Sequence, residues 1–187
     1  AASDVYKRQA EFGPETSLGW VPANLGIGPL GHIVDDIPYG SSGDLRLLPD
    51  HDSLVRVDGI PNRTPYNVVF ADLVETDGTP WSACPRTFLK NALRDLKDEF
   101  GLTSRATFEH EFVDMSATGE HHPFSFQEFS RLEPIGTQLM TILHDAGLEP
   151  ENWLPEYGKH QYEVTVKPSD PLTADAPANL ARENLYD

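Results

Sequence analysis

The fold is decided by the stretch Ala106-Thr-Phe-Glu-His-Glu-Phe-Val113, in which β-branched and aromatic residues surround two carboxylates. This composition favours a β-strand. Successive strand side chains point to opposite faces, so Glu109 and Glu111 share one face, and His110 lies on the other with the two phenylalanines. We expect so apolar a strand to be buried, where two neighbouring carboxylates are costly. A bound cation would remove that cost.

A second acidic segment repeats this pattern further along the chain. It reads Leu154-Pro-Glu-Tyr-Gly-Lys-His-Gln-Tyr-Glu-Val-Thr-Val166, with Glu163 inside an alternating strand and Glu156 just before it. Alternation in both segments predicts that Glu109, Glu111 and Glu163 project from adjacent strands onto a common concave face, with Glu156 at its rim.

The two segments, in this order and spacing, resemble the glutamine synthetase family, which includes the γ-glutamyl-polyamine synthetases. The resemblance implies that both segments bind metal. Glu111, Glu156 and Glu163 would hold one divalent cation, and Glu109 would help to hold a second. Glu151, five residues before Glu156, matches a family glutamate that contributes to the nucleotide site. No catalytic residue can be assigned.

The first part of the chain carries further family-like motifs. A Gly-Ser-Ser sequence at 40–42, followed by Leu-Leu-Pro-Asp50, resembles the family's N-terminal β-grasp domain, whose Gly-Ser-Ser loop reaches the neighbouring subunit's active site. Two positions depart from the family pattern. Tyr39 stands where glutamine-forming members usually carry Asp, and Cys84 replaces the Asp that precedes Pro85-Arg86.

The predicted fold class is α+β. A β-grasp-like domain at 10–83 is followed by the start of a glutamine synthetase-type catalytic α/β domain at 84–187, with a mainly antiparallel sheet. Residues 1–9 resemble translated adapter sequence and are set aside as a non-native leader. The chain stops inside what reads as a starting helix at 181–187, so we expect a truncated catalytic domain and a fragment without activity of its own.

Local patterns predict the individual elements. Short strands are expected near Leu18–Val21 and Leu45–Pro49, and a strand at Asn67–Glu75 leads through Asp77-Gly78 into a return strand. A helix from Pro85 to Gly101 carries an apolar stripe that we expect to lie in the core.

Two further helix starts are predicted nearer the end of the chain. Ser125 to Glu128 fits a capping box, but Pro134 would break a helix begun there, so we favour a helix from near Glu133 to Gly147. Asp170-Pro-Leu-Thr-Ala-Asp175 reads as the exit of a strand and the start of the next helix.

The loop at 114–123 contains the run Glu120-His121-His122, which allows a metal-binding interpretation. No third ligand lies at a suitable spacing, and the family carries a variable insertion here. We therefore favour a solvated loop.

Composition excludes several function classes. The formal net charge is −16, with 30 Asp and Glu against 14 Lys and Arg, so no basic surface is available for nucleic acid. At 39% hydrophobic residues the chain can bury a core. Cys84 is the only cysteine, which excludes an intrachain disulfide and favours a reducing cytoplasm. No apolar run approaches the roughly 20 residues of a membrane span, and no signal peptide is visible.

The resemblance implies an ATP-dependent ligase that joins the γ-carboxylate of glutamate to ammonia or an amine through a γ-glutamyl phosphate. It implies Mg²⁺ or Mn²⁺, ATP as co-substrate, and a homo-oligomer with active sites between subunits. Two alternatives stay open. Tyr39 and Cys84, as departures, allow a non-catalytic binding or regulatory module. A simple calcium-binding acidic domain is disfavoured, because no EF-hand-like loop is present.

Tyr39 also bears on the acceptor substrate. In glutamine-forming relatives the Asp at this position helps to bind ammonium and remove its proton, whereas a phenol is neutral near pH 7. We therefore favour an organic amine over ammonia, as in the γ-glutamyl-polyamine synthetases. The other interpretation is that the loop shifts and Asp35 or Asp36 serves instead.

Overall fold

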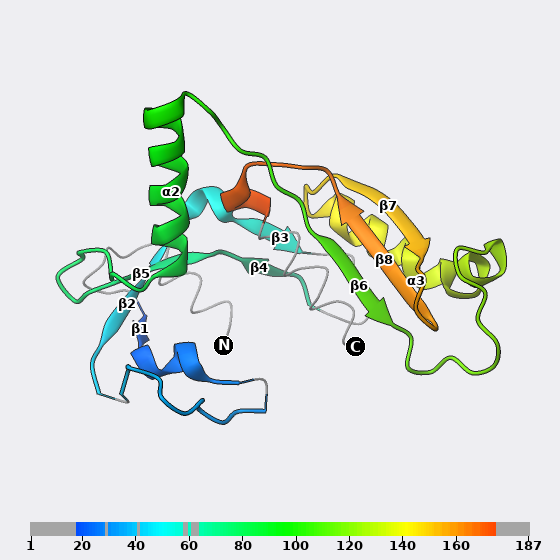
Figure 1. Ribbon diagram of the computed structural model, residues 1–187, viewed down its shortest axis with the longest axis horizontal. Helices are drawn as coiled ribbons and strands as arrows, with labels where there is room; N and C mark the ends of the chain where they lie inside the picture. Colours follow the sequence, from blue (N-terminus) through cyan, green and yellow to red (C-terminus); the bar gives the residue numbers. More distant parts are fainter. Residues whose placement is uncertain (1–17, 29, 41, 58–59, 61–63, 175–187) are drawn as a thin grey trace. The chain divides into compact units, whose positions relative to one another are not determined.

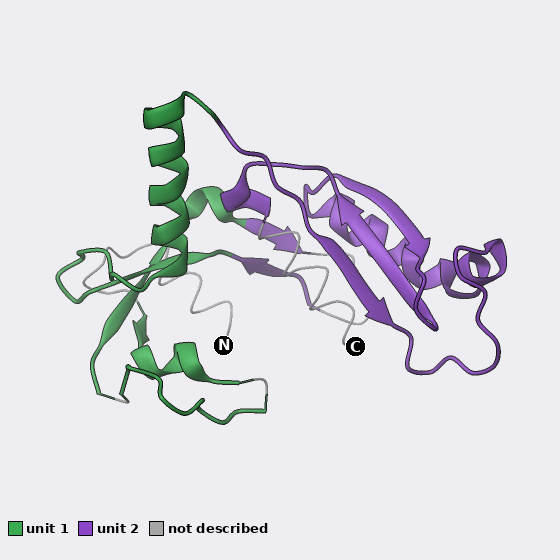
Figure 2. Cartoon of the chain, in the orientation of Figure 1, with its two compact units in different colours: residues 1–54, 69–102 green, residues 55–68, 103–187 purple. Residues whose placement is uncertain are grey.

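The computed structural model describes residues 18–28, 30–40, 42–57, 60 and 64–174. Figure 2 shows its two compact units: unit 1 comprises residues 1–54 and 69–102, and unit 2 comprises residues 55–68 and 103–187. The expected leader at 1–9 and the helix start at 181–187 lie outside the described residues. Helices and antiparallel sheets together give the predicted α+β class.

Unit 1 is built on a small antiparallel sheet in the order β1-β2-β5. Its strands are β1 (Gly19–Trp20), β2 (Leu45–Pro49) and β5 (Ala71–Val74), accompanied by the 3-10 helices η2 (Pro22–Gly26) and η3 (His51–Ser53). Both short strands predicted in this region are therefore confirmed. The buried core contains Leu45, Leu73, Trp81 and Cys84, and Tyr39 packs against it.

The strand predicted at 67–75 is split in two. Its first part is β4 (Tyr66–Val68), which pairs with β3 (Val55–Val57) in unit 2. Its second part, β5, pairs with β2 in unit 1. The expected hairpin is present after β5. The Glu75 N–H donates to the Thr79 carbonyl at 2.8 Å, and Val74 and Pro80 form an antiparallel β-bridge.

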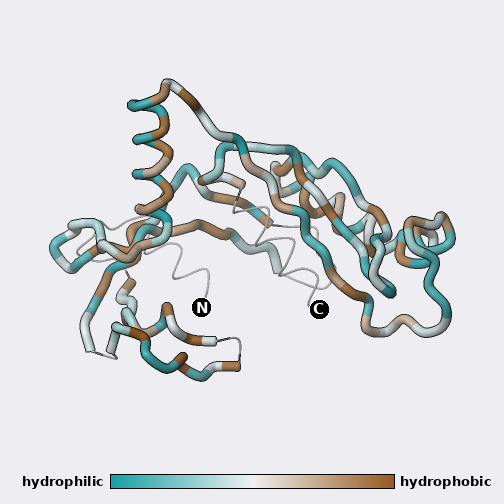
Figure 3. The backbone as a smooth tube through the Cα atoms, in the orientation of Figure 1, coloured by the Kyte–Doolittle hydropathy of each residue, from teal (hydrophilic) through white to brown (hydrophobic). Residues whose placement is uncertain are grey.

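Helix α2 (Pro85–Phe100) has the predicted ends, with proline in its first turn and Gly101 in the left-handed region at φ 68°. The prediction that its apolar stripe lies in the core is wrong. None of its residues is buried, and Phe88 is 76% exposed. Figure 3 shows hydrophobic and hydrophilic stretches alternating along this helix. In the first two turns Arg86 and Lys90 form ion pairs with Asp72 of β5, whereas the later apolar residues Leu93 and Leu96 are only partly buried.

Besides the β3–β4 pair, unit 2 holds a three-stranded antiparallel sheet in the order β6-β8-β7. Strand β8 (Gln161–Val166) lies between β6 (Glu109–Val113) and β7 (Pro150–Pro155), and helix α3 (Phe126–Asp145) covers one face (Figure 1). The prediction that the Glu-x-Glu strand is buried is wrong. Because β6 is an edge strand within the described sheet, its alternate residues are exposed, whereas Tyr162, Val164 and Val166 of β8 are buried.

Helix α3 corrects the predicted start near Glu133. It begins at Phe126, with Ser125 as N-cap: the Ser125 Oγ accepts a hydrogen bond from the Glu128 N–H at 3.2 Å. Pro134 lies inside the helix, where it lacks an N–H and costs about 3 kcal/mol. The cap and the buried side chains of Glu128 and Leu132 hold the earlier turns onto the sheet, which offsets that cost. Gly147, with φ 81°, ends the segment as predicted.

The last described segment agrees with the predicted helix start. After Asp170, residues 171–174 are helical, and the Asp170 carboxylate accepts a hydrogen bond from the Leu172 N–H at 3.0 Å. Within the described chain, no helix is both long and apolar enough to cross a membrane.

Candidate metal centre

The two acidic segments meet in the sheet of unit 2. In the β6–β8 pairing Glu111 lies directly opposite Glu163, and Glu109 lies opposite Thr165. Residues opposite each other in an antiparallel pair point to the same face. Tyr162, the neighbour of Glu163, contacts α3, so the three glutamates project from the opposite face of the sheet.

Glu156 completes the group from the β7–β8 connection, as the first residue after β7. One carboxylate oxygen from each of Glu111, Glu156 and Glu163 lies within 4.8 Å of the others. The Glu156 backbone N–H donates to the Gln161 carbonyl at 2.8 Å, and its carboxylate accepts from the Tyr157 N–H at 2.9 Å. The structure thus brings together three of the four glutamates predicted to hold metal.

The electrostatics of this group are unfavourable without a cation. Burial raises the pKa of Glu163, and the nearby charges of Glu109, Glu156 and Glu111 raise it further. Among the residues that the structure describes, none of these four carboxylates has a Lys, Arg or His ion-pair partner. A cluster of oxygen donors short of positive charge is chemistry that suits Mg²⁺ or Mn²⁺. We call Glu109, Glu111, Glu156 and Glu163 the acidic cluster.

The other two predicted site residues lie outside the three-residue group. Glu109 is on the same face and raises the pKa of Glu163, so it is a near neighbour of the group. Glu151 is exposed at an irregularity of β7, between Pro150 and Asn152. Its charge acts on Lys167, whose pKa is raised mainly by Glu149. The structure does not bring Glu151 to the acidic cluster.

The histidine loop differs from its prediction at one residue. Glu120 and His122 are exposed, as expected for a solvated loop, but the His121 side chain is only 6% exposed. His121 lies against Glu128 and His160, and one atom from each of these three residues falls within 4.8 Å of the others. The capping-box pattern at 125–128 could have predicted this burial of His121, because a helix that starts there brings Glu128 next to the loop.

Tyr39 and Cys84, the two residues that depart from the family pattern, both contact core residues of unit 1. The Tyr39 ring packs edge-on against Trp81 at a centroid distance of 5.0 Å. Cys84 is the N-cap of α2, and its Sγ accepts a hydrogen bond from the Leu73 N–H at 3.3 Å. Burial alone raises the pKa of the Cys84 thiol, but hydrogen bonds from Thr87 and Leu73 lower it overall. Ser41 of the Gly-Ser-Ser sequence lies outside the described residues.

Comparison with known families gives two matches that are adjacent in the sequence. The family described as "Glutamine synthetase N-terminal domain" matches residues 13–81, and the family described as "Glutamine synthetase, catalytic domain" matches residues 82–182. The second match includes every residue of the acidic cluster.

Individual relatives agree with these matches. Gamma-glutamylpolyamine synthetase GlnA3 of Streptomyces coelicolor is 28% identical over 159 residues, which cover 80% of this chain and 34% of that protein. Type-1 glutamine synthetase 1 of Dictyostelium discoideum is 30% identical over 113 residues, covering 51% of this chain and 22% of that protein. A solved structure titled "Crystal structure of novel glutamine synthase homolog" is 39% identical, with a TM-score of 0.82 over 97% of this chain and 42% of that chain. The chain therefore spans less than half the length of each of these relatives.

Proposed function

The chain belongs to the glutamine synthetase family, and we propose that it is part of an ATP-dependent ligase that joins the γ-carboxylate of glutamate to ammonia or an amine. The reaction would proceed through a γ-glutamyl phosphate. The observation that carries this proposal is the convergence of Glu111, Glu156 and Glu163, whose carboxylate oxygens lie within 4.8 Å of one another without a basic partner among the described residues.

The residues fit a divalent cation. Glu111, Glu156 and Glu163 would hold one Mg²⁺ or Mn²⁺ through carboxylate oxygens, the ligands these ions prefer. Glu109, on the same face, would help to hold a second, and Glu151 would contribute to the nucleotide site. When bound, the cation offsets the repulsion between the phosphates of ATP and the carboxylate of glutamate.

The chain's own residues would keep this site open and aligned. The β6–β8 register places Glu111 across from Glu163, and the hydrogen bond from the Glu156 N–H to the Gln161 carbonyl fixes the third ligand. In phosphoryl transfer most catalysis comes from such positioning of charges.

We also propose the division into a β-grasp-like domain at 10–83 and the start of a catalytic domain at 84–187. The two family matches, which meet between residues 81 and 82, support it. Helix α2 nevertheless packs in unit 1, since Arg86 and Lys90 pair with Asp50 and Asp72. By its resemblance to the family, we also propose that the protein forms a homo-oligomer with active sites between neighbouring subunits.

For the acceptor we propose an organic amine in preference to ammonia. Tyr39 places a neutral side chain where an Asp would bind ammonium, and its packing on Trp81 favours a fixed position for the ring. The relative named as a gamma-glutamylpolyamine synthetase supports the same choice.

The test is a phosphate-release assay with ATP, glutamate and Mg²⁺ on a protein of family length that includes this chain. Ammonium, putrescine and ethanolamine are compared as acceptors. We expect the highest kcat/KM with an organic amine, and no release by the 187-residue chain alone. Highest kcat/KM with ammonium would make the protein a glutamine synthetase. No release with any acceptor would favour the non-catalytic module.

A further inference from the structure

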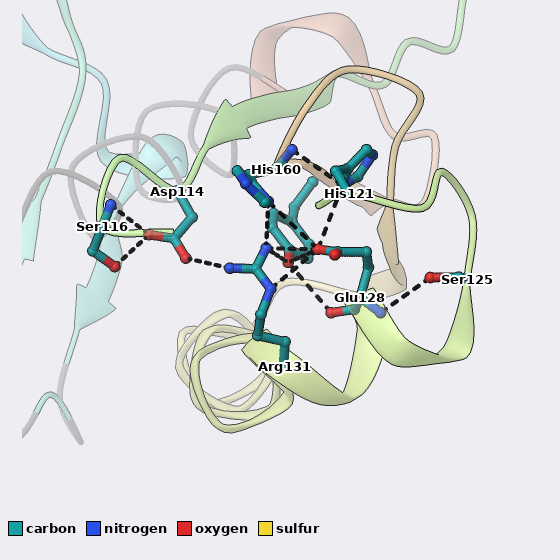
Figure 4. Close-up of polar contacts among 8 residues, drawn as sticks. Asp114, Ser116, His121, Ser125, Glu128, Arg131 and His160 are labelled. Carbon is teal, nitrogen blue, oxygen red and sulfur yellow. Dashed lines mark hydrogen bonds and ion pairs between the residues drawn. The ribbon is translucent and has the colours of Figure 1, made fainter. Parts of the chain in front are cut away.

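A second polar cluster lies on the α3 side of the unit 2 sheet, which is the face opposite the acidic cluster. Figure 4 shows its polar contacts. We call it the Arg131 network. Its members are Asp114, His121, Glu128, Arg131, His160 and Tyr162.

Arg131 connects three separate parts of the chain to helix α3. Its Nη2 lies 2.6 Å from Glu128 Oε2, 2.7 Å from Tyr162 Oη and 2.9 Å from His160 Nδ1, so these three acceptors share its two N–H groups. Its Nη1 donates to Asp114 Oδ2 at 3.3 Å. A guanidinium can do this because its donors are arranged in a rigid planar fork. One side chain thereby contacts the residue that follows β6, the β7–β8 connection and the start of β8.

His160 is the residue most constrained by these contacts. Its backbone has φ 54°, a left-handed conformation that costs a residue other than glycine about 1 kcal/mol or more. Its N–H donates to His121 Nδ1 at 3.2 Å, and its carbonyl accepts from the Asp114 N–H at 2.9 Å. With the Arg131 bond, three contacts hold this unfavourable conformation in place.

His160 lies in the connection that joins two of the predicted metal ligands. Glu156 is the first residue of the connection, and Glu163 is the third residue of β8 after it. The Gly158 N–H donates to Gln161 Oε1 at 2.8 Å, and the Gln161 N–H donates to the Gly158 carbonyl at 3.0 Å, so the connection is a closed turn. The backbone conformation of His160 is therefore part of the turn that separates Glu156 from Glu163.

We propose that Arg131 is a positioning residue that sets the distance between Glu156 and Glu163, and with it the affinity of the acidic cluster for a divalent cation. This inference rests on the proposed function, because it assumes that the acidic cluster binds metal. Tyr162 and Glu163 are neighbours that point to opposite faces of β8, so Arg131 holds the strand from behind while the carboxylates face away. Groups that orient metal ligands from behind typically change metal affinity by about 10–100-fold when removed.

The same cluster is not a second metal site. His121, Glu128 and His160 offer ligand atoms within 4.8 Å of one another, a set that could otherwise suit zinc. Arg131 Nη2, however, already donates to the Glu128 carboxylate and to His160 Nδ1. A metal ion there would lie beside a fixed positive charge and would have to displace these bonds.

The test measures Mn²⁺ affinity in the 187-residue chain by the electron paramagnetic resonance signal of free Mn²⁺. Arg131→Lys keeps a positive charge near Glu128 but cannot reach all four partners, so we expect about tenfold weaker binding. A second variant, Glu128→Gln with Arg131→Met, avoids an unpaired buried charge and should bind Mn²⁺ about tenfold more weakly as well. Circular dichroism confirms that each variant is folded at the temperature of the titration.

Two controls separate positioning from general destabilisation. Lys90→Met removes a partly exposed ion pair with Asp72 in unit 1, so its melting temperature should fall while its Mn²⁺ affinity stays unchanged. Glu163→Gln should remove most of the binding. If Glu163→Gln binds Mn²⁺ as the unaltered chain does, or the unaltered chain binds none, the metal site fails and this inference fails with it. If Glu163→Gln loses binding but both folded Arg131 variants bind normally, only the positioning role of Arg131 is overturned.

Discussion

Glu128 and Glu163 are both shielded carboxylates on opposite sides of one three-stranded sheet. The pKa of Glu128 lies below the ordinary value of a glutamate, whereas the pKa of Glu163 lies above it. Burial alone would raise the pKa of Glu128, but hydrogen bonds from Arg131 and Tyr162 and the Arg131 charge lower it to about 2. Burial raises the pKa of Glu163, and three neighbouring glutamates raise it further. Glu128 therefore has a cationic partner, Arg131, whereas Glu163 has no such partner among the described residues.

This difference separates a structural carboxylate from a ligand. The Glu128 side chain is 2% exposed, and its Oε2 binds Arg131 of the same helix and Tyr162 of β8, which fastens α3 to the sheet. The charges of three neighbouring glutamates and a hydrogen bond with Glu156 all raise the pKa of Glu163, so its neighbours disfavour its ionised form. A group of carboxylates that repel one another favours the binding of a cation. The following predictions test the contrast between the paired Glu128 and the crowded Glu163.

The largest effect is expected from Arg131→Ala. This change leaves the buried charge of Glu128 without its guanidinium partner, and the loss of one partner of a buried ion pair typically costs about 3–5 kcal/mol. Urea denaturation at pH 7 measures the free energy of unfolding. Arg94→Ala is the matched control on an exposed helix face, where the loss should stay below about 1 kcal/mol. Equal losses in the two variants would show that the Arg131 network contributes no special stability.

The pH dependence of stability gives the second prediction. The folded pKa of Glu128, about 2, lies below its usual value of 4.5, so its stabilisation is present above pH 4.5 and disappears as pH falls toward 2. Glu128→Gln should therefore be less stable than the unaltered chain by about 1–3 kcal/mol at pH 7, and the difference should shrink steadily below pH 4.5. Urea denaturation at several pH values measures it. A difference that is the same at pH 7 and pH 2.5 would contradict the assignment.

The third prediction concerns metal affinity. Glu111→Ala removes one of three converging carboxylates and should weaken Mn²⁺ binding by about tenfold or more, since affinity follows the number of charged ligands. Glu120→Ala alters an exposed loop residue and should leave the affinity unchanged. Titration calorimetry compares the two variants. Equal affinities would count against the acidic cluster as the metal site.

The smallest effect has the opposite sign to that of Glu128→Gln. Glu163→Gln relieves repulsion directly across from Glu111, so without metal it should stabilise the chain by about 0.2–1 kcal/mol. The raised folded pKa requires the same sign, because a proton on Glu163 stabilises the fold and that gain is lost as pH rises through the folded pKa. Melting temperatures in EDTA and in saturating Mn²⁺ measure the change. Destabilisation in EDTA would show that Glu163 already has a favourable partner.

The sequence predicted most of what alternation and turn chemistry control. Strand periodicity placed Glu109 and Glu111 on one face, and proline and glycine marked the ends of α2. The strand at 67–75 could not be seen to divide, because both parts have the same local composition and pair with different partners in different units.

The errors arose where tertiary contacts outweigh local preference. Pro134 argued against a helix from Ser125, but the buried bond between Glu128 and Arg131 fastens the turns before it. His121 looked like loop surface because its partners, Glu128 and His160, lie 7 and 39 residues further along the sequence. A local sequence pattern cannot predict the contact of His121 with His160, because it depends on how the β7–β8 connection packs against α3.

The most direct test of the acidic cluster is anomalous diffraction from crystals grown or soaked with Mn²⁺. We expect the strongest anomalous peak between the carboxylates of Glu111, Glu156 and Glu163, at a distance of about 2.0–2.2 Å from their oxygens. A crystal with no peak at these carboxylates, or with its strongest peak among His121, Glu128 and His160, would contradict the account.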